Sequence, residues 1–494
     1  MLLPSRGSTP RSRQRRSEPD WWRRAGAACV LSAVAALAAN AQTFTSLFSF
    51  DYTDGYGPAA ALVQATNGNF YGTTDGGGAN GYGTVFKITP TSGTLTTLYN
   101  FCSLAACADG SEPAGALVEA TNGDFYGMTD GGGANGYGTV FKITPSGTLT
   151  TLYSFDYTDG YEPYAGLIQA TNGNFYGTTV YGGANNSSLC LDGGCGTIFK
   201  ITPGGTLTTL YNFCSQGDCT DGAAPYGGLV QATNGNFYGT TYLGGADGDG
   251  TVFEITPSGT LTTLHSFDGA DGDQTLAALV QATNGNLYGT TAAGGASGYG
   301  TVFKITPSGT LTTLHSFDGT DGQTPEAALV QATDGNFYGT TYYAGGANGD
   351  GTVFKITPSG ALTTLHSFDG TDGADPGAAL VQDTNGTFYG TTEVGGTSSD
   401  CSGGCGTIFS LSVGLVPFVE TNPTSGKVGA AVKILGTNLT GSTSVTFNGT
   451  ASTFTVNSRS FITTTVPAGA TTGTVKVVTP SGTLSSNVPF RVVP

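Results

Sequence analysis

Directly after Ser-Phe, five short segments carry two aspartates in the pattern Asp-x-x-Asp-Gly, and their carboxylates are candidate metal ligands. Calcium takes six to eight oxygen ligands, often several from one loop, so each segment could start a calcium site. The alternative is a turn in which aspartate accepts backbone N–H bonds and glycine takes a positive φ. We favour the turn and expect no required cofactor, with Ca²⁺ as the alternative. The candidate ligands are Asp268, Asp271, Asp273, Asp318, Asp321, Asp369 and Asp372.

Eight cysteines form four close pairs along the chain. The pairs are Cys102 and Cys107, Cys190 and Cys195, Cys214 and Cys219, and Cys401 and Cys405. An even number of cysteines at short spacing indicates disulfides in an exported chain, and no histidine lies near them to complete a zinc site. We expect nearest-neighbour disulfides. An exchange of partners between the second and third pairs stays open.

Two further residue sets have side chains that could act in catalysis. His265, His315 and His366 occupy one repeated position that holds Phe or Tyr elsewhere, which favours a packed position over a metal site. Glu112, Glu162 and Glu326 each lie beside a proline. Carboxylates about 5–9.5 Å apart can hydrolyse a glycosidic bond, but these three belong to different repeats, so we expect solvated loop positions. We therefore assign no catalytic residue and expect a protein that is not an enzyme.

Seven copies of one unit position these residues, marked by Tyr-Gly-Thr-Thr or Tyr-Gly-Met-Thr from Tyr71 to Tyr389. Each unit has four short pieces rich in Thr, Val, Ile, Phe or Tyr, separated by turn residues, which predicts four strands. The seventh unit lacks its fourth piece, and an unpaired copy stands at 43–50. The copy at the N-terminus can supply the strand that the seventh unit lacks, and this arrangement favours a closed ring over a solenoid. We predict an all-β fold, with a seven-bladed β-propeller over 42–414 closed by the N-terminal strand.

The first 41 residues have another composition. Seven arginines precede an apolar run from Ala25 to Ala39, and Ala39-Asn40-Ala41 follows. This pattern is typical of a secretory signal peptide, so we predict a signal peptide over 1–41 with cleavage after Ala41 and no transmembrane segment in the mature chain. The net charge of −17 disfavours binding to nucleic acid or to anionic lipid.

The last 80 residues, 415–494, resemble an IPT/TIG domain, an immunoglobulin-like β-sandwich. The resemblance rests on Asn-Pro-Thr-Ser-Gly at 422–426, on Gly-Thr-Asn-Leu at 436–439 and on Val-Pro-Ala-Gly at 466–469. The resemblance implies a spacer or an interaction module, which is what this family usually provides in exported bacterial proteins. The resemblance brings no catalytic residues to this chain.

The repeats also resemble a known family. NGNFYGTT, a glycine-rich segment, GTVFKITPSG and LTTLHSF are similar to the GloVer (Gloeo/Verruco) repeat of exported bacterial proteins, over residues 43–412. The resemblance implies an extracellular, propeller-like repeat and no known activity. In some members a C-terminal sorting anchor follows the repeats, whereas this chain ends after the sandwich.

These observations together predict a secreted or cell-surface binding module that acts as a monomer. Its variable loops, rich in Tyr, Asn and Gly, suit a carbohydrate or an extracellular protein as ligand. One alternative is an extracellular polysaccharide hydrolase or lyase that uses loop carboxylates. The other is a purely structural surface protein.

Overall fold

The computed structural model describes residues 42–190, 193–346 and 348–493. The predicted signal peptide and its cleavage site after Ala41 lie outside the described residues. Within the described ranges, no helix combines the length and the apolar character that a membrane span needs.

Seven four-stranded antiparallel sheets make up the described part of 42–412. The first has β2 (Val63–Gln64), β3 (Phe70–Thr74), β4 (Thr84–Thr89) and β5 (Thr94–Asn100); the second has β6 (Val118–Glu119), β7 (Phe125–Thr129), β8 (Thr139–Ile143) and β9 (Leu149–Ser154); the third has β10 (Ile168–Gln169), β11 (Phe175–Thr179), β12 (Thr197–Ile201) and β13 (Leu207–Asn212). The fourth has β14 (Val230–Gln231), β15 (Phe237–Thr241), β16 (Thr251–Ile255) and β17 (Leu261–Ser266); the fifth has β18 (Val280–Gln281), β19 (Leu287–Thr291), β20 (Thr301–Ile305) and β21 (Leu311–Ser316); the sixth has β22 (Val330–Gln331), β23 (Phe337–Thr341), β24 (Thr352–Ile356) and β25 (Leu362–Ser367).

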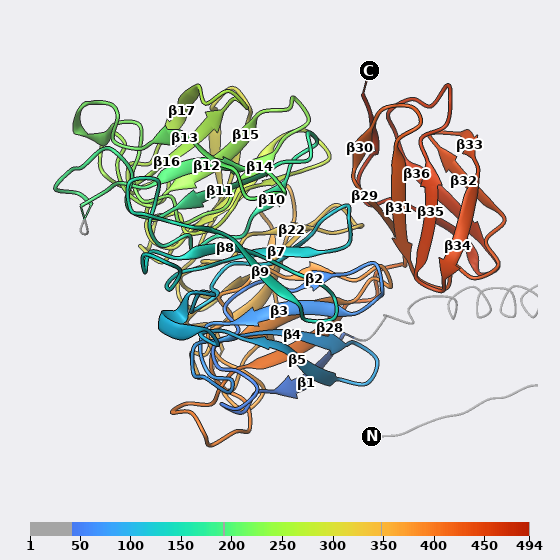
Figure 1. Cartoon of the computed structure of the whole chain (residues 1–494), viewed down its shortest axis with the longest axis horizontal. Coiled ribbons are helices and arrows are strands. Elements are labelled where there is room, and N and C mark those ends of the chain that lie inside the picture. The colour runs from blue at the N-terminus through green and yellow to red at the C-terminus, as the bar shows by residue number, and fades with distance from the viewer. Residues whose placement is uncertain (1–41, 191–192, 347, 494) are drawn as a thin grey trace, which may run out of the picture. The chain divides into compact units, whose positions relative to one another are not determined.

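The seventh sheet takes one strand from the start of the described chain. Its order is β26 (Val381–Gln382), β27 (Phe388–Thr392), β28 (Thr407–Ser412) and β1 (Thr43–Ser49). β1 runs antiparallel to β28, with Thr43 opposite Ser412 and Ser49 opposite Thr407. In Figure 1 the blue β1 lies in the same part of the molecule as the orange β28. The repeated sheets are propeller-like, and the prediction of an all-β fold is confirmed for the residues that the structure describes.

The glycine of Tyr-Gly-Thr-Thr is explained by packing inside each sheet. A Cβ on Gly239 would lie 2.5 Å from Cζ of Phe253 and 3.0 Å from Cδ2 of Leu229. Real side chains do not approach so closely, so a larger residue would force the phenylalanine ring out of the core. The repeated glycine therefore belongs to the core of the sheet.

Neighbouring sheets are joined by the same contacts at successive joints. The tyrosine of the second strand stacks on the next sheet's second strand, as in Tyr126 on Phe175, with ring centroids 4.1 Å apart. A backbone N–H in the turn after each first strand donates to a side chain of the next sheet's first strand. The bonded pairs are Thr66 with Glu119, Thr121 with Gln169, Thr171 with Gln231, Thr233 with Gln281, Thr283 with Gln331, Thr333 with Gln382 and Thr384 with Gln64.

The first strand of each repeat is shorter than predicted. The sequence favours strands over the whole of segments such as 165–170, but only two residues of each pair with the second strand, for example Ile168–Gln169. The residues before them, such as Ala165 and Gly166, line a cavity instead. They therefore bound an open space and extend no sheet.

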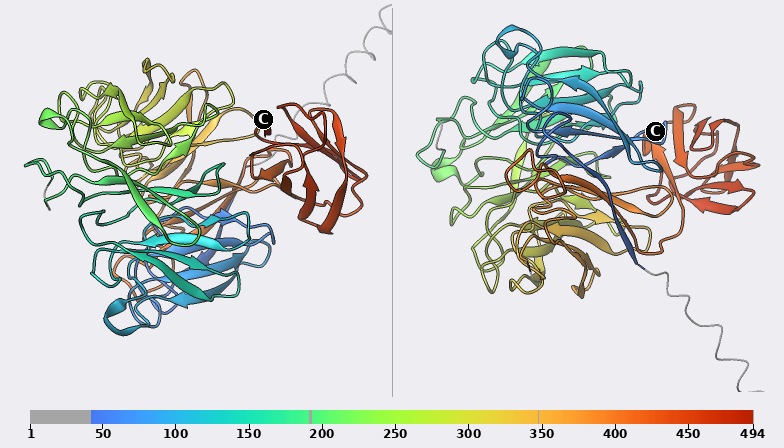
Figure 2. Two further views of the ribbon diagram at one scale, coloured as in Figure 1. Left: turned by 45° about the horizontal axis from the view of Figure 1, so that its top comes forward. Right: turned by 90° about the horizontal axis from the view of Figure 1, so that it is seen from below.

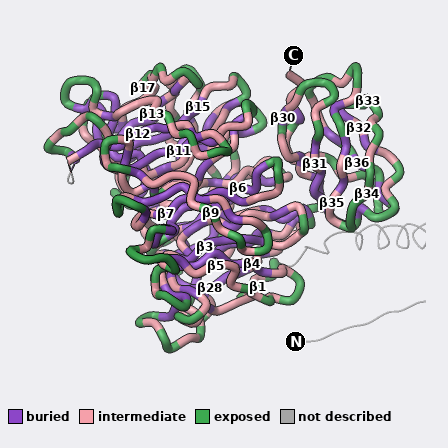
Figure 3. The backbone as a smooth tube through the Cα atoms, viewed as in Figure 1, coloured by how far each residue is buried: buried purple, intermediate pink, exposed green. Residues whose placement is uncertain are grey.

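Each repeat sheet has two ends that differ in their connections. At the long-loop end lie the segments between second and third strands, such as 75–83, and those leading to the next sheet, such as 101–117. At the short-turn end lie turns such as 65–69 and 145–148. The strands between are largely buried, and exposed residues gather in the connections (Figure 3). Two short 3-10 helices, η1 (Ala105–Cys107) and η2 (Gly217–Cys219), lie in long loops.

The C-terminal segment forms two four-stranded sheets and a two-stranded one (Figure 2, red). One sheet has β29 (Val419–Asn422), β31 (Ala431–Gly436), β35 (Phe461–Thr465) and β34 (Phe454–Ser458); the other has β33 (Thr450–Ser452), β32 (Ser444–Phe447), β36 (Val475–Thr479) and β37 (Gly482–Ser485). β30 (Ser425–Gly426) pairs with β38 (Arg491–Val492). The core includes Val432, Ile434, Phe447 and Phe490.

Candidate functional site

The aspartates of the Asp-x-x-Asp-Gly loops are bonded to their own loops. Oδ1 of Asp369 accepts the N–H groups of Thr371 and Asp372, at 3.0 and 3.1 Å. Oδ1 of Asp372 accepts the N–H of Asp369 at 3.0 Å. Asp268 with Asp271 and Asp318 with Asp321 follow the same scheme. Asp273 lies at a bridge to Ala293 instead, and burial raises the pKa of its carboxyl. The turn interpretation predicts such hydrogen bonds from backbone N–H groups to the aspartates. A calcium role for these aspartates stays a prediction.

Each histidine lies on the fourth strand of a different sheet and contacts its own aspartate. Nε2 of His265, His315 and His366 lies 2.7, 2.6 and 2.8 Å from Oδ2 of Asp271, Asp321 and Asp372. Each ring also packs edge-on against the phenylalanine two residues later. The structure thus places the three histidines as separate, packed side chains.

The eight cysteines among the described residues form four disulfides between nearest neighbours, Cys102–Cys107, Cys190–Cys195, Cys214–Cys219 and Cys401–Cys405. All four lie in connections at the long-loop end. Two of them adjoin each other, because Sγ of Cys190 lies 3.9 Å from Sγ of Cys214.

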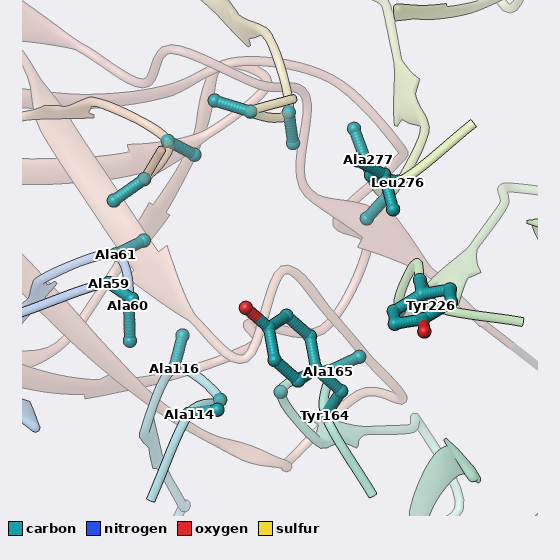
Figure 4. A pocket seen from close by; sticks show the side chains of 18 of the residues that line it. Ala59, Ala60, Ala61, Ala114, Ala116, Tyr164, Ala165, Tyr226, Leu276 and Ala277 are labelled. Carbon is teal, nitrogen blue, oxygen red and sulfur yellow. The ribbon is translucent and has the colours of Figure 1, made fainter. Parts of the chain in front are cut away.

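A cavity of 410 Å³ in the repeat region is lined by residues from all seven repeats. Alanine and glycine form most of its wall, and Figure 4 shows alanine side chains around an open space into which the ring of Tyr164 reaches. The remaining large or charged lining residues include Tyr226, Glu326 and Glu393. We call this space the axial cavity.

Two repeated positions supply the polar residues at and near this cavity. One follows Tyr-Gly-Thr-Thr and holds Asp75, Asp130, Val180, Tyr242, Ala292, Tyr342 and Glu393. The other is the short segment before each first strand, which contains Glu112, Glu162, Tyr164, Tyr226 and Glu326. Backbone bonds hold the two together within a repeat, since the N–H of Asp130 donates to the carbonyl of Glu112 at 3.0 Å.

The predicted glutamates do not share one position. Glu112 and Glu162 precede a proline and take positive φ, 59° and 52°, whereas Glu326 follows Pro325. Only Glu326 lines the axial cavity, so the structure separates it from the other two.

Glu112 and Glu162 belong to an acidic group around Asp130. Burial, followed by repulsion from Glu162, Asp75 and Glu112, raises the pKa of Asp130 to about 8. Its Oδ1 is buried and has no hydrogen-bond partner among the described residues. Burial and Glu112 also raise the pKa of Asp75, to about 6. Ionisation of Asp130 and Asp75 is therefore unfavourable in the absence of a nearby positive charge.

A second acidic group consists of Glu326 and Glu393, both at the cavity wall. Burial and the nearby Glu393 raise the pKa of Glu326 to about 7. Burial also raises the pKa of Glu393 to about 7, although Tyr342 donates its hydroxyl to Oε2 at 2.8 Å. Two carboxyl groups that titrate near neutrality could exchange protons with a bound molecule.

Tyrosines occupy another part of the same region. Tyr226 packs edge-on against Tyr164 and Tyr242, with ring centroids 5.7 and 5.3 Å apart. Its hydroxyl lies 3.1 Å from that of Tyr181. Aromatic faces and hydroxyl groups thus lie beside the small-residue wall.

Among the described residues, lysine and arginine are absent from the long-loop end of the repeat sheets. The described residues between 42 and 414 include five lysines, Lys87, Lys142, Lys200, Lys304 and Lys355, and no arginine. All five lie in third strands opposite the tyrosine that starts Tyr-Gly-Thr-Thr, toward the short-turn end.

Sequence reasoning missed Asp75, Asp130, Tyr342 and Glu393. The available signal was variation at one position, directly after Tyr-Gly-Thr-Thr, inside an otherwise constant phrase. Variable positions on a constant scaffold are where binding residues gather.

Comparison with known structures finds similar folds. A fungal alcohol oxidase of the AA5 family in complex with copper matches with a TM-score of 0.50 and 13% identity, covering 92% of this chain and 99% of that one. A putative 6-phosphogluconolactonase from Bacteroides fragilis matches with a TM-score of 0.42 and 17% identity, covering 65% and 86%. A gluconolactonase from Xanthomonas campestris matches with a TM-score of 0.38 and 11% identity, covering 77% and 92%. At these identities the likeness concerns the fold alone.

Family models match most of the chain. The Gloeobacter/Verrucomicrobia repeat matches residues 32–191 and 189–409, and the IPT/TIG domain matches residues 418–492. No curated protein matches the chain. Both predicted resemblances are thereby confirmed, and the chain belongs to the Gloeobacter/Verrucomicrobia repeat family and carries a C-terminal IPT/TIG domain.

Proposed function

We propose that this protein is an exported, non-catalytic binding module that takes a carbohydrate at the axial cavity. On this proposal the seven repeat sheets are the blades of a closed propeller, and the IPT/TIG domain that follows them is an interaction module. The bond from Thr384 to Gln64 and the pairing of β1 with β28 support closure. The disulfides support an oxidising, extracellular location.

The observation that carries the proposal is the chemistry around the axial cavity. Tyr164 and Tyr226 offer ring faces to the CH patches of a sugar, and Glu326 and Glu393 offer acceptors for its hydroxyl groups. A cavity of 410 Å³ lies in the size range of small-ligand sites. The lack of lysine and arginine among the described residues of the long-loop end favours neutral or amino sugars over acidic ones.

Native gels cast with different polysaccharides test the proposal. We expect retarded migration of the purified chain in at least one gel. Tyr164→Ala and Tyr226→Ala should each weaken retention about tenfold, since loss of one sugar-stacking ring removes about 1–2 kcal/mol of binding free energy. The control Tyr52→Ala removes a ring that is 44% exposed and lies outside the cavity wall, and it should leave retention unchanged.

Migration that no polysaccharide changes would contradict carbohydrate binding and direct the search to extracellular proteins. If no partner of either kind is retained, the protein acts as a structural surface protein.

A polysaccharide hydrolase or lyase is the second candidate, and one observation favours it. Glu326 and Glu393 line one cavity, and both have a pKa raised to about 7, as a general acid requires. If this candidate is correct, the retained polysaccharide is degraded to shorter chains with new reducing or unsaturated ends. Glu326→Gln with Glu393→Gln would then abolish degradation and keep retention. For a binder, no degradation occurs with either chain.

A further inference from the structure

Two of the four disulfides adjoin each other. Cys190–Cys195 belongs to the connection between β11 and β12, and Cys214–Cys219 belongs to the connection that follows β13. The sulfurs of Cys190, Cys195 and Cys214 all lie within 4.8 Å of one another. Sγ of Cys190 lies 3.9 Å from Sγ of Cys214, which is close to van der Waals contact.

The four cysteines differ in burial, and this difference decides which sulfur an external thiolate attacks first. Cys190, Cys195 and Cys219 are buried in one apolar cluster with Ile198 and Phe213, whereas Cys214 is packed against this cluster and partly exposed. An external thiolate therefore reaches Cys214 first. Buried thiols behave as small apolar side chains, so Cys195 and Cys219 can remain in the cluster in reduced form.

The other two disulfides lack such a neighbour. Cys102–Cys107 follows the first repeat sheet, and the connection beside it, 75–83, holds no cysteine. Cys401–Cys405 lies beside the segment 50–57, which again holds none. Each of these two disulfides therefore lies in one of the two loop types without a second disulfide beside it. The two loop types carry adjacent disulfides only at the third repeat, so Cys102–Cys107 and Cys401–Cys405 serve as controls within the same chain.

We propose that Cys190, Cys195, Cys214 and Cys219 form one thiol–disulfide exchange site that acts when an external dithiol reduces Cys214–Cys219. The dithiol's thiolate attacks Sγ of Cys214, and Cys219 leaves and takes up a proton. The second thiol of the reductant then closes its own disulfide and releases Cys214 as a thiolate. This thiolate attacks Sγ of Cys190, the Cys190–Cys195 bond breaks, and Cys195 takes up a proton.

One equivalent of dithiol thus supplies two electrons, and the site ends with one disulfide, Cys190–Cys214, and two thiols, Cys195 and Cys219. The new bond joins two loops that the original bonds close separately. A mild reductant therefore converts two local bridges into one strap between neighbouring connections at the long-loop end.

Limited reduction of the purified, oxidised full chain tests the proposal. The protein is treated with less dithiothreitol than its four disulfides require, quenched with acid, labelled with N-ethylmaleimide and mapped by mass spectrometry. We expect a peptide that joins Cys190 to Cys214, with label on Cys195 and Cys219. Label on Cys214 and Cys219 with Cys190–Cys195 intact would overturn the proposal. So would joined peptides from Cys102 or Cys401 at equal yield, because they indicate unspecific scrambling.

Paired variants test the same geometry without a reductant. Cys195→Ser with Cys219→Ser leaves Cys190 and Cys214, and we expect them to form a disulfide and leave no free thiol other than Cys29. The matched control, Cys195→Ser with Cys214→Ser, leaves Cys190 and Cys219, whose sulfurs do not share the close group, and we expect two free thiols in addition to Cys29. Circular dichroism compares the folding of the two variants. Equal thiol contents in two folded variants would contradict the proposal.

Discussion

The long-loop end and the short-turn end of the repeat sheets differ in how far the seven copies have diverged. At the short-turn end the same Asn-Gly or Asp-Gly turn, the same tyrosine and the same inter-sheet bond recur around the repeats. At the long-loop end the residue after Tyr-Gly-Thr-Thr is acidic, aromatic or aliphatic in different copies. The short-turn end keeps the same residues because they join neighbouring sheets. The side chains at the long-loop end can differ between repeats and can therefore form a binding or catalytic site.

The largest effect on stability is expected from Asp130→Asn at the long-loop end. Burial raises the pKa of Asp130 to about 8 from an ordinary value of 3.8, so the folded chain holds this proton more tightly than the unfolded chain. The stability that the neutral carboxyl provides is fully present below about pH 4 and is lost as the pH rises toward 8. The Asp130→Asn variant should therefore be more stable than the parent protein by about 2–4 kcal/mol at pH 7 and equally stable at pH 4.

Urea unfolding across this pH range measures the effect. A constant difference between the two proteins at all pH values would show that the charge of Asp130 is not the cause. A destabilised variant at pH 7 would show that the site favours the ionised carboxylate, and the contrast between the two ends would then be smaller than described.

A medium and opposite effect is expected at the short-turn end. Oε1 of Gln231 accepts the N–H of Thr171 at 2.9 Å, and its Nε2 donates to the carbonyl of Gly235 at 3.1 Å. Gln231→Ala should therefore destabilise the protein by about 1–2 kcal/mol at every pH and leave polysaccharide retention unchanged. Gln323→Ala at the long-loop end is the control and should change the unfolding midpoint little. An equal loss of stability in the two variants would contradict the expected difference between the short-turn end and the long-loop end.

The smallest effect is expected in the loop that follows β1. Asp54 lies where other repeats pair an aspartate with a tyrosine or histidine, but Phe48 takes that place and offers no polar group. Burial raises the pKa of Asp54 to about 6. Phe48→His should restore the pair and lower this pKa, with a gain in stability of about 0.5–1 kcal/mol. Titration of the Asp54 carboxyl by NMR checks the shift, and an unchanged pKa would contradict the assigned cause.

Much of the repeat architecture could be predicted because each repeat carries its own strand and turn signals. Val, Ile, Phe and Thr in short runs, with Gly and Pro between them, define the four strands of a sheet without reference to distant residues. The first strand was overestimated, since Ala165 and its neighbours are as apolar as a strand but face a cavity. The predicted domain boundaries at 41 and 414 stay predictions.

The candidate site was predictable only in part. Glu326 was singled out beside its proline, but its partner Glu393 lies in a different repeat, and no sequence pattern gives the separation of two such side chains. Asp130 was overlooked because a single aspartate before a glycine-rich segment resembles a turn residue. Its unusual pKa arises from burial and from three carboxyl groups in other segments, which only the folded chain brings together.

The pairing of β1 with β28 has a consequence for biosynthesis. Translation makes Thr43 long before Ser412, at about 5–20 residues per second. The strand that opens the repeat region must therefore wait tens of seconds for its partner, with the apolar residues Phe44, Leu47 and Phe48 uncovered. In a cell this interval is the time during which the nascent chain most needs a holding chaperone, and a slower ribosome would lengthen it.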